Sequence, residues 1–64
     1  MVKINGKDIE AEGKTIAEYL QSANYDTRTI VIELNEEIVQ KTQYDETKLN
    51  DGDVVEIISF MGGG

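Results

Sequence analysis

The sequence predicts an α+β domain in which one main helix packs across a mixed, five-stranded β-sheet. Three observations carry this prediction. An Asn-Gly turn joins two short alternating segments near the start, helical periodicity covers about residues 15–23, and "DVVEIISF" forms a nearly continuous apolar run near the end. Strands on both sides of one helix suggest a helix layer on a sheet layer. The length of 64 residues allows one domain, which we expect to span residues 1–60.

The first element is expected to be a β-hairpin within "VKINGKDIEA". The dipeptide Asn5-Gly6 is typical of a two-residue type I′ turn. Such a turn places Val2 opposite Ile9, because two-residue loops fix the register of the strands. The apolar residues of the hairpin then share one buried face, made of Val2, Ile4, Ile9 and Ala11.

The next segment, "GKTIAEYLQSA", changes to helical spacing. Thr15 followed by Glu18 forms the pattern of a capping box, which marks a helix start. Apolar residues then recur at helical intervals, at Ile16, Tyr19, Leu20 and Ala23. We expect this short helix to lie on the sheet, with Tyr19 in the core and its hydroxyl at the edge.

The second half of the chain is expected to supply three strands and a brief helical turn. In order these are strand 30–34, a tight turn at Asn35-Glu36, strand Ile38-Val39, a helical turn near Glu46–Leu49, and strand Val54–Phe60. The last strand is so apolar that it is typical of a strand covered on both faces or placed at the sheet centre. The β-grasp arrangement satisfies this order, because it pairs the first and last strands in parallel at the centre.

The composition excludes several classes of function. The chain has neither Cys nor His, so disulfides, Cys/His zinc sites, a thiol nucleophile and an imidazole base are all absent. A net charge of −7 disfavours nucleic acid and favours either solubility or a basic patch on a protein partner. No apolar run approaches a membrane span, so we expect no membrane partner and a cytoplasmic location.

The acidic residues do not indicate catalysis or a metal site. Asp45–Glu56 has the length of a calcium loop, but Thr47 and Leu49 occupy ligand positions, so it is better interpreted as a turn before a strand. Adjacent carboxylates such as Glu36-Glu37 are expected to be solvated surface. We therefore expect no metal site and no catalytic residue, and hence that the chain is not an enzyme by itself.

The candidate functional segment is the end of the sequence, "FMGGG". Glycine buries no side chain, so residues 61–64 add nothing to a core and are expected to form a flexible tail. A glycine tail can be dispensable, or its narrowness can let a main-chain carboxylate reach a partner's active site. Phe60, at the exit of the last strand, is interpreted either as a core anchor or as a partner contact.

The whole chain resembles the sulfur-carrier proteins of the thiamine-biosynthesis type, within the ubiquitin-like β-grasp group. The resemblance rests on "VKINGK", "TIAEYL", "IVIELNEEIV", "LNDGDVVEII" and the final Gly63-Gly64. One position departs from the pattern, because Gly62 stands where family members commonly carry a bulkier residue.

The resemblance implies that Gly64 is the sulfur-carrying residue. An adenylyltransferase related to ubiquitin-activating enzymes would use ATP and Mg²⁺ to adenylate its carboxylate, and a persulfide from a donor such as a cysteine desulfurase would convert it to a thiocarboxylate. A thiazole synthase would then receive the sulfur. Gly62 and Gly63 would thread the partner active site, Phe60 and Met61 would contact partners, and the chain itself would bind no cofactor.

Three alternatives stay open at this point. The chain could carry sulfur for molybdopterin synthesis or tRNA thiolation, although those domains tend to be longer. It could be a ubiquitin-like modifier that becomes joined to lysines of other proteins. It could also be a plain interaction domain with an inert tail.

Overall fold

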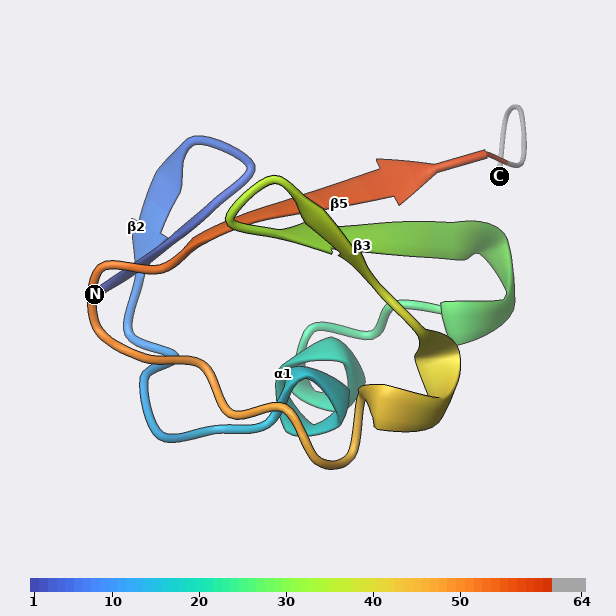
Figure 1. Cartoon of the computed structure of the whole chain (residues 1–64), viewed down its shortest axis with the longest axis horizontal. Helices are drawn as coiled ribbons and strands as arrows, with labels where there is room; N and C mark the ends of the chain where they lie inside the picture. The colour runs from blue at the N-terminus through green and yellow to red at the C-terminus, as the bar shows by residue number, and fades with distance from the viewer. Residues whose placement is uncertain (61–64) are drawn as a thin grey trace.

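The fold has two layers, a five-stranded sheet and a single α-helix below it (Figure 1). The computed structural model describes residues 1–60; the predicted tail, with Met61 and Gly62 to Gly64, lies outside the described residues. The elements are β1 (Val2–Ile4), β2 (Lys7–Ile9), α1 (Ile16–Ser22), the 3₁₀ turn η1 (Thr27–Thr29), β3 (Ile30–Leu34), β4 (Glu37–Val39), the 3₁₀ turn η2 (Lys41–Gln43) and β5 (Val54–Ser59).

The hairpin of β1 and β2 has the predicted register. Val2 lies opposite Ile9, and the turn residues Asn5 and Gly6 have φ values of 50° and 83°. Both values lie in the left-handed region that a type I′ turn requires. The hairpin therefore presents its apolar residues to the core, and Ala11 just beyond β2 is fully buried.

Helix α1 begins where the capping box predicted. The Thr15 side chain accepts a hydrogen bond from the Glu18 N–H at 3.1 Å, and the Glu18 carboxylate accepts one from the Thr15 N–H at 2.8 Å. These bonds satisfy backbone donors that the first helical turn leaves unpaired. The helix buries Ile16 and Leu20 against the sheet, so its apolar stripe is the layer contact.

Strand β5 occupies the centre of the sheet, whose order is β2-β1-β5-β3-β4. It runs parallel to β1 and antiparallel to β3, as the β-grasp prediction requires. Its inward residues Val55 and Ile57 are buried, whereas Val54 and Ile58 are exposed. The apolar run therefore marks a central strand that is covered on one face, not a strand covered on both.

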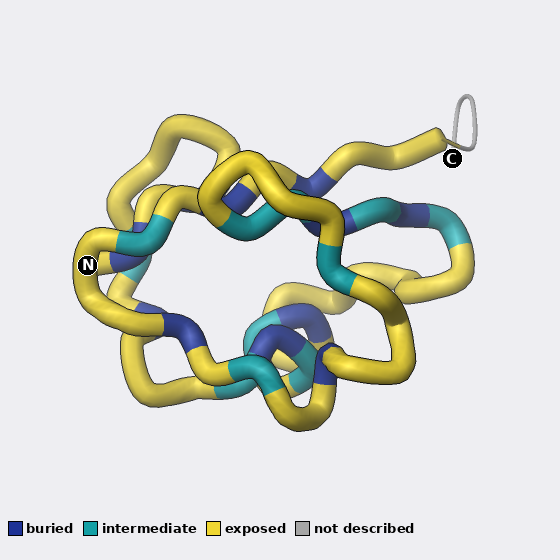
Figure 2. Tube along the Cα trace, viewed as in Figure 1, coloured by how far each residue is buried: buried dark blue, intermediate teal, exposed yellow. Residues whose placement is uncertain are grey.

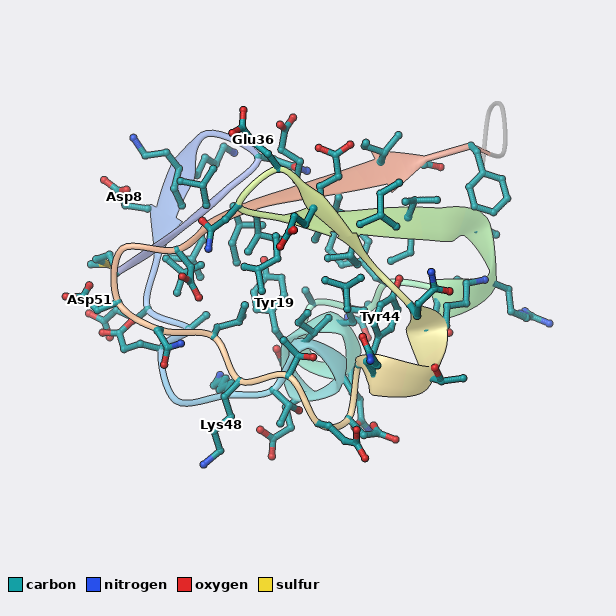
Figure 3. The ribbon with its side chains drawn as sticks, viewed as in Figure 1. Asp8, Tyr19, Glu36, Tyr44, Lys48 and Asp51 are labelled. Atoms are coloured by element: carbon teal, nitrogen blue, oxygen red, sulfur yellow. The ribbon has the colours of Figure 1, made fainter. Side chains whose placement is uncertain are left out.

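The core lies between the helix and the inner face of the sheet (Figure 2). Its most deeply buried large side chains come from four different parts of the chain, namely Val2, Leu20, Ile32 and Leu49. Tyr19 is partly buried against this cluster, and both Tyr19 and Tyr44 lie between the helix layer and the sheet (Figure 3). The prediction for Tyr19 is thus confirmed.

The prediction of a helical turn near Glu46–Leu49 is wrong, because the helical turn occurs earlier in the chain, at η2. Residues 47–49 are instead extended beside the segment that leads into α1: the Ile16 N–H donates to the Thr47 carbonyl, and the Leu49 N–H donates to the Lys14 carbonyl at 2.8 Å. Burial of Leu49 and Tyr44 fixes this path.

The turn η1 was not predicted; the Asp26 carboxylate caps it by accepting from the Arg28 N–H.

Replacing Ile32 tests which face of β3 is buried. Its side chain has no exposed surface, so Ile32→Ala is expected to lower the free energy of unfolding by about 2–5 kcal/mol, through lost burial and the cavity left behind. Urea unfolding measures the change. Ile38→Ala in β4 is the matched control, because Ile38 is 64% exposed and the same deletion there should cost about 0.5 kcal/mol or less. A loss below about 1 kcal/mol for Ile32→Ala would contradict this placement.

Candidate functional site

The candidate site is the outer face of the sheet where β5 leads toward the glycine segment. Side chains alternate along β5, so Val55 and Ile57 point to the core while Glu56 and Ile58 belong to the opposite face. Helix α1 covers only the inner face (Figure 1). Within residues 1–60 no element lies over the outer face, which leaves it open to a partner.

Three aliphatic residues form what we call the outer patch: Val31, Ile38 and Ile58. Ile58 lies directly opposite Val31 on the neighbouring strand, and it is 44% exposed. Val31 and Ile38 line one shallow groove beside β4. Ile38 is 64% exposed and Val31 is half-buried, so the outer patch offers a small apolar surface to a partner.

Two glutamates lie side by side next to the outer patch. Glu33 on β3 is directly opposite Glu56 on β5, and Ile38 flanks Glu33 on the other side. Like charges on directly opposed strand positions are destabilising. Within residues 1–60 neither carboxylate takes part in a salt bridge, so the pair is available to a basic group of a partner.

Phe60 marks the point at which the chain leaves the sheet. Its N–H donates to the Thr29 carbonyl at 3.1 Å, so it continues the β3–β5 ladder one residue beyond β5. The side chain is 57% exposed, which rules out the core-anchor interpretation. The role of Phe60 as a partner contact stays a prediction, as do those of Met61 and Gly62 to Gly64, which lie outside the described residues.

The remaining charged groups are structural. The Arg28 guanidinium donates to the Asp26 carboxylate at 3.0 and 3.1 Å, and these hydrogen bonds hold the pKa of Asp26 below its usual range. The N-terminal ammonium bonds the Asp51 carboxylate, which raises the pKa of the ammonium. Asp51, Lys48 and Asp8 point away from the core (Figure 3).

Nothing among residues 1–60 resembles a catalytic or metal centre. No group of three or more acidic residues is arranged to hold a metal ion in this part of the chain. The perturbed tyrosines, Tyr19 and Tyr44, have a raised pKa because burial disfavours the phenolate, and both pack against the core; Tyr44 also lines the groove beside β4. No helix of the described chain is long and apolar enough to cross a membrane.

The outer patch was not singled out from the sequence. Ile38 and Ile58 were placed in strands, but each was read as part of an apolar run rather than as an exposed residue. The signal that could have identified them is the alternation with Glu33 and Glu56, which assigns one face of β5 to solvent.

Comparison with known proteins decides the family. The model of the ThiS family matches residues 2–64, which is nearly the whole chain. The chain belongs to the ThiS family. A ThiS sulfur carrier protein from Bacillus subtilis is 39% identical to it over 66 aligned positions that cover all of both chains. A thiazole synthase from Paramagnetospirillum magneticum is 39% identical over 62 residues, which span 95% of this chain and 19% of that protein.

A solved ThiS structure shares the fold. The crystal structure of the thiamine biosynthesis protein ThiS from Geobacter metallireducens superposes with a TM-score of 0.80 at 33% identity, covering 98% of this chain and 97% of that one. The predicted ubiquitin-like β-grasp fold is therefore confirmed, both by strand order and by this neighbour.

Neutralising one member of the glutamate pair tests whether the two carboxylates repel each other. Glu56→Gln is expected to raise the free energy of unfolding by about 0.2–1 kcal/mol, because it removes a like-charge cross-strand pair. The measurement is urea unfolding at low salt. Glu10→Gln makes the same change of net charge at an exposed site without an opposed carboxylate. An equal gain in both variants would show that overall charge, and not the pair, is responsible.

Proposed function

We propose that this ThiS-family chain is a sulfur carrier for thiazole formation in thiamine biosynthesis, with the Gly64 carboxyl as its reactive group. The observation that carries the proposal is the match to ThiS over residues 2–64, which includes the glycine segment together with the fold. Relatives that align over their full length are named sulfur carriers, not catalysts.

The chemistry follows from the poor reactivity of a carboxylate. Attack of the Gly64 carboxylate on the α-phosphate of ATP releases pyrophosphate and creates an acyl-adenylate, whose AMP is a good leaving group. A persulfide sulfur displaces AMP, and cleavage of the sulfur–sulfur bond by a thiol leaves the thiocarboxylate. This group is largely ionised and nucleophilic at neutral pH, as a thiol of low pKa is. Transfer of its sulfur to the thiazole precursor, in exchange for an oxygen atom from the precursor's carbonyl group or from water, regenerates the carboxylate.

The run Gly62-Gly63-Gly64 suits such a reagent. Glycine lacks a Cβ, so its backbone can approach a nucleotide closely and adopt dihedral angles that other residues avoid. Because the chain contains no Cys, the sulfur has no competing thiol on the carrier to which it could transfer. Gly62 extends this narrow segment by one residue.

A relative supports one of the proposed partners, and the chemistry alone supports the other two. In the Paramagnetospirillum protein named thiazole synthase, a segment similar to this chain makes up 19% of one polypeptide, which supports a thiazole synthase as a partner here. An adenylyltransferase related to ubiquitin-activating enzymes, using ATP and Mg²⁺, and a sulfur donor such as a cysteine desulfurase follow from the chemistry. We propose that the carrier acts in the cytoplasm.

The outer patch is proposed as the surface that these partners recognise. Exposed apolar residues supply the buried contact area of an interface, and the adjacent Glu33–Glu56 pair would meet a basic group on the partner. Phe60 lies between this face and the glycine segment, so a partner that holds Phe60 also directs the reactive end.

The relatives favour the thiamine route over the alternatives. The aligned carriers are ThiS proteins, and one aligned enzyme is a thiazole synthase. A role in molybdopterin synthesis or tRNA thiolation has no such support. A ubiquitin-like modifier would use the same acyl-adenylate but would give amide-linked conjugates in cell extract, and this outcome distinguishes it.

Removing Gly64 tests the reactive group. The truncated chain is expected to form no thiocarboxylate with the adenylyltransferase, ATP and a sulfur donor, because the carboxylate would sit one residue short of the nucleotide. Intact-mass analysis would detect the replacement of one oxygen by sulfur, and fragmentation would locate it in the full-length chain.

The control for this experiment is the thermal stability of the truncated chain. The core residues all lie between Val2 and Ile57, so the truncated chain should keep the thermal midpoint of the full chain. A comparable yield of thiocarboxylate from the truncated chain would show that Gly64 is not the site.

Truncating Phe60 tests the partner contact. Phe60→Ala is expected to lower kcat/KM for adenylation by roughly tenfold or more, as removal of an aromatic anchor at an interface does. Stability should change little, because the ring is 57% exposed. Tyr25→Ala is the matched control: Tyr25 is also an exposed aromatic residue, but it follows α1 and lies outside the β5 ladder. Equal effects of the two variants would remove Phe60 from the interface.

A further inference from the structure

The hydrogen-bonding groups of β5 alternate between its two neighbours. On the β3 side, the Val54 carbonyl accepts from the Asn35 N–H at 2.7 Å, and the Phe60 N–H donates to the Thr29 carbonyl at 3.1 Å. Residues 54, 56, 58 and 60 therefore direct their backbone groups to β3, since the direction alternates along a strand.

Residues 55, 57 and 59 direct theirs to the β1 side. There the Val55 carbonyl accepts from the Asn5 N–H at 3.0 Å, at the point where β1 ends. Beyond this point the Asn5 side chain takes the place that the backbone of a longer β1 would occupy. Its Oδ1 accepts from the Ile57 N–H at 2.8 Å, and its Nδ2 donates to the Ile57 carbonyl at 3.4 Å. This side chain is the last group of the hairpin that reaches β5.

Ser59 is the first residue of β5 beyond that reach. It lies opposite Ile30 in a pair that does not exchange hydrogen bonds, because the β3-bonded positions of β5 are residues 54, 56, 58 and 60. Among residues 1–60 the Ser59 N–H and carbonyl have no partner on the β1 side, and the residue is exposed. The central strand thus becomes an open edge just before the glycine segment, on the side away from β3 (Figure 1).

We propose that an extended segment of the activating adenylyltransferase pairs with β5 at Ser59 and continues the sheet in the place that the β1–β2 hairpin leaves vacant. This inference rests on the proposed function. Strand addition to an open edge gives affinity through main-chain hydrogen bonds and fixes the direction of the bound chain. Ser59 precedes Gly64 by five residues, a reach of about 17 Å when extended. A strand paired at Ser59 therefore aims the reactive carboxylate at a nucleotide within that distance.

Charge favours a partner protein over a second copy of this chain at the same edge. Each copy carries a net charge of −7, so two copies would repel each other on approach. The outer patch and the Glu33–Glu56 pair are continuous with this edge through β5, so one partner can cover all three. A partner with basic residues beside its extended segment fits this surface.

The test is Ser59→Pro, assayed with the adenylyltransferase by ATP–pyrophosphate exchange. The substitution removes the N–H on the open side and leaves the β3-directed groups of Ile58 and Phe60 in place; proline is accepted on strand edges. Ser59→Ala is the matched control, because it removes only the hydroxyl. We expect kcat/KM to fall roughly tenfold or more in Ser59→Pro, which leaves an acceptor of the partner unpaired, and to stay near the wild-type value in Ser59→Ala.

Each outcome has a distinct meaning. Equal kcat/KM for Ser59→Pro and Ser59→Ala, with both variants folded by their NMR spectra, would overturn the strand pairing and leave the proposed function intact. A wild-type chain that is not adenylated at all would overturn the proposed function and, with it, this inference. If Ser59→Pro fails to fold, a semisynthetic chain with an ester in place of the Ser59 amide removes the same donor, and normal activation of that chain would overturn the pairing. Pairing of two copies instead would appear as a dimer that Ser59→Pro abolishes in sedimentation.

Discussion

Strand β5 holds the two halves of this molecule together, because it is hydrogen-bonded to β1 from the start of the chain and to β3 from the middle. Two turn asparagines reinforce the same strand. The Asn5 side chain bonds the backbone of Ile57, and the Asn35 Oδ1 accepts from the Val54 N–H at 2.9 Å. The strand that precedes the glycine segment is thus held on both sides, by backbone ladders and by these two side chains.

The two faces of the sheet divide structure from recognition. The inner face buries Ile32, Val55 and Ile57 under α1 and supplies the core, which must be sufficient because the chain has no disulfide. The outer face retains exposed aliphatic residues and the opposed pair Glu33–Glu56, neither of which stabilises an isolated domain. These residues lie beside the end of β5, on the face that α1 leaves uncovered, which is the surface proposed for partner recognition.

Short-range signals made most of the fold predictable. Asn5-Gly6 fixed the hairpin register and Thr15 with Glu18 fixed the helix start, because each depends on bonds within a few residues. The path of residues 41–49 was not predictable, since distant contacts of Tyr44 and Leu49 determine it and local periodicity is absent. For the site, glycine content alone singled out the end of the sequence, and the resemblance gave it a role. The outer patch was missed because exposure depends on which face the helix covers. The roles of Gly62 to Gly64 stay predictions.

The central position of β5 also affects how the protein is made. β5 is the last described element along the chain, yet β1 and β3 pair only with β5 and not with each other, so it alone joins them in one sheet. During translation, the hairpins β1–β2 and β3–β4 therefore cannot join into one sheet until this final segment has left the ribosome. A chain that ends before β5 cannot form the complete sheet, so its unpaired strands would be open to proteolysis. Any copy that folds has consequently been synthesised at least as far as the strand that directly precedes the proposed sulfur-carrying segment.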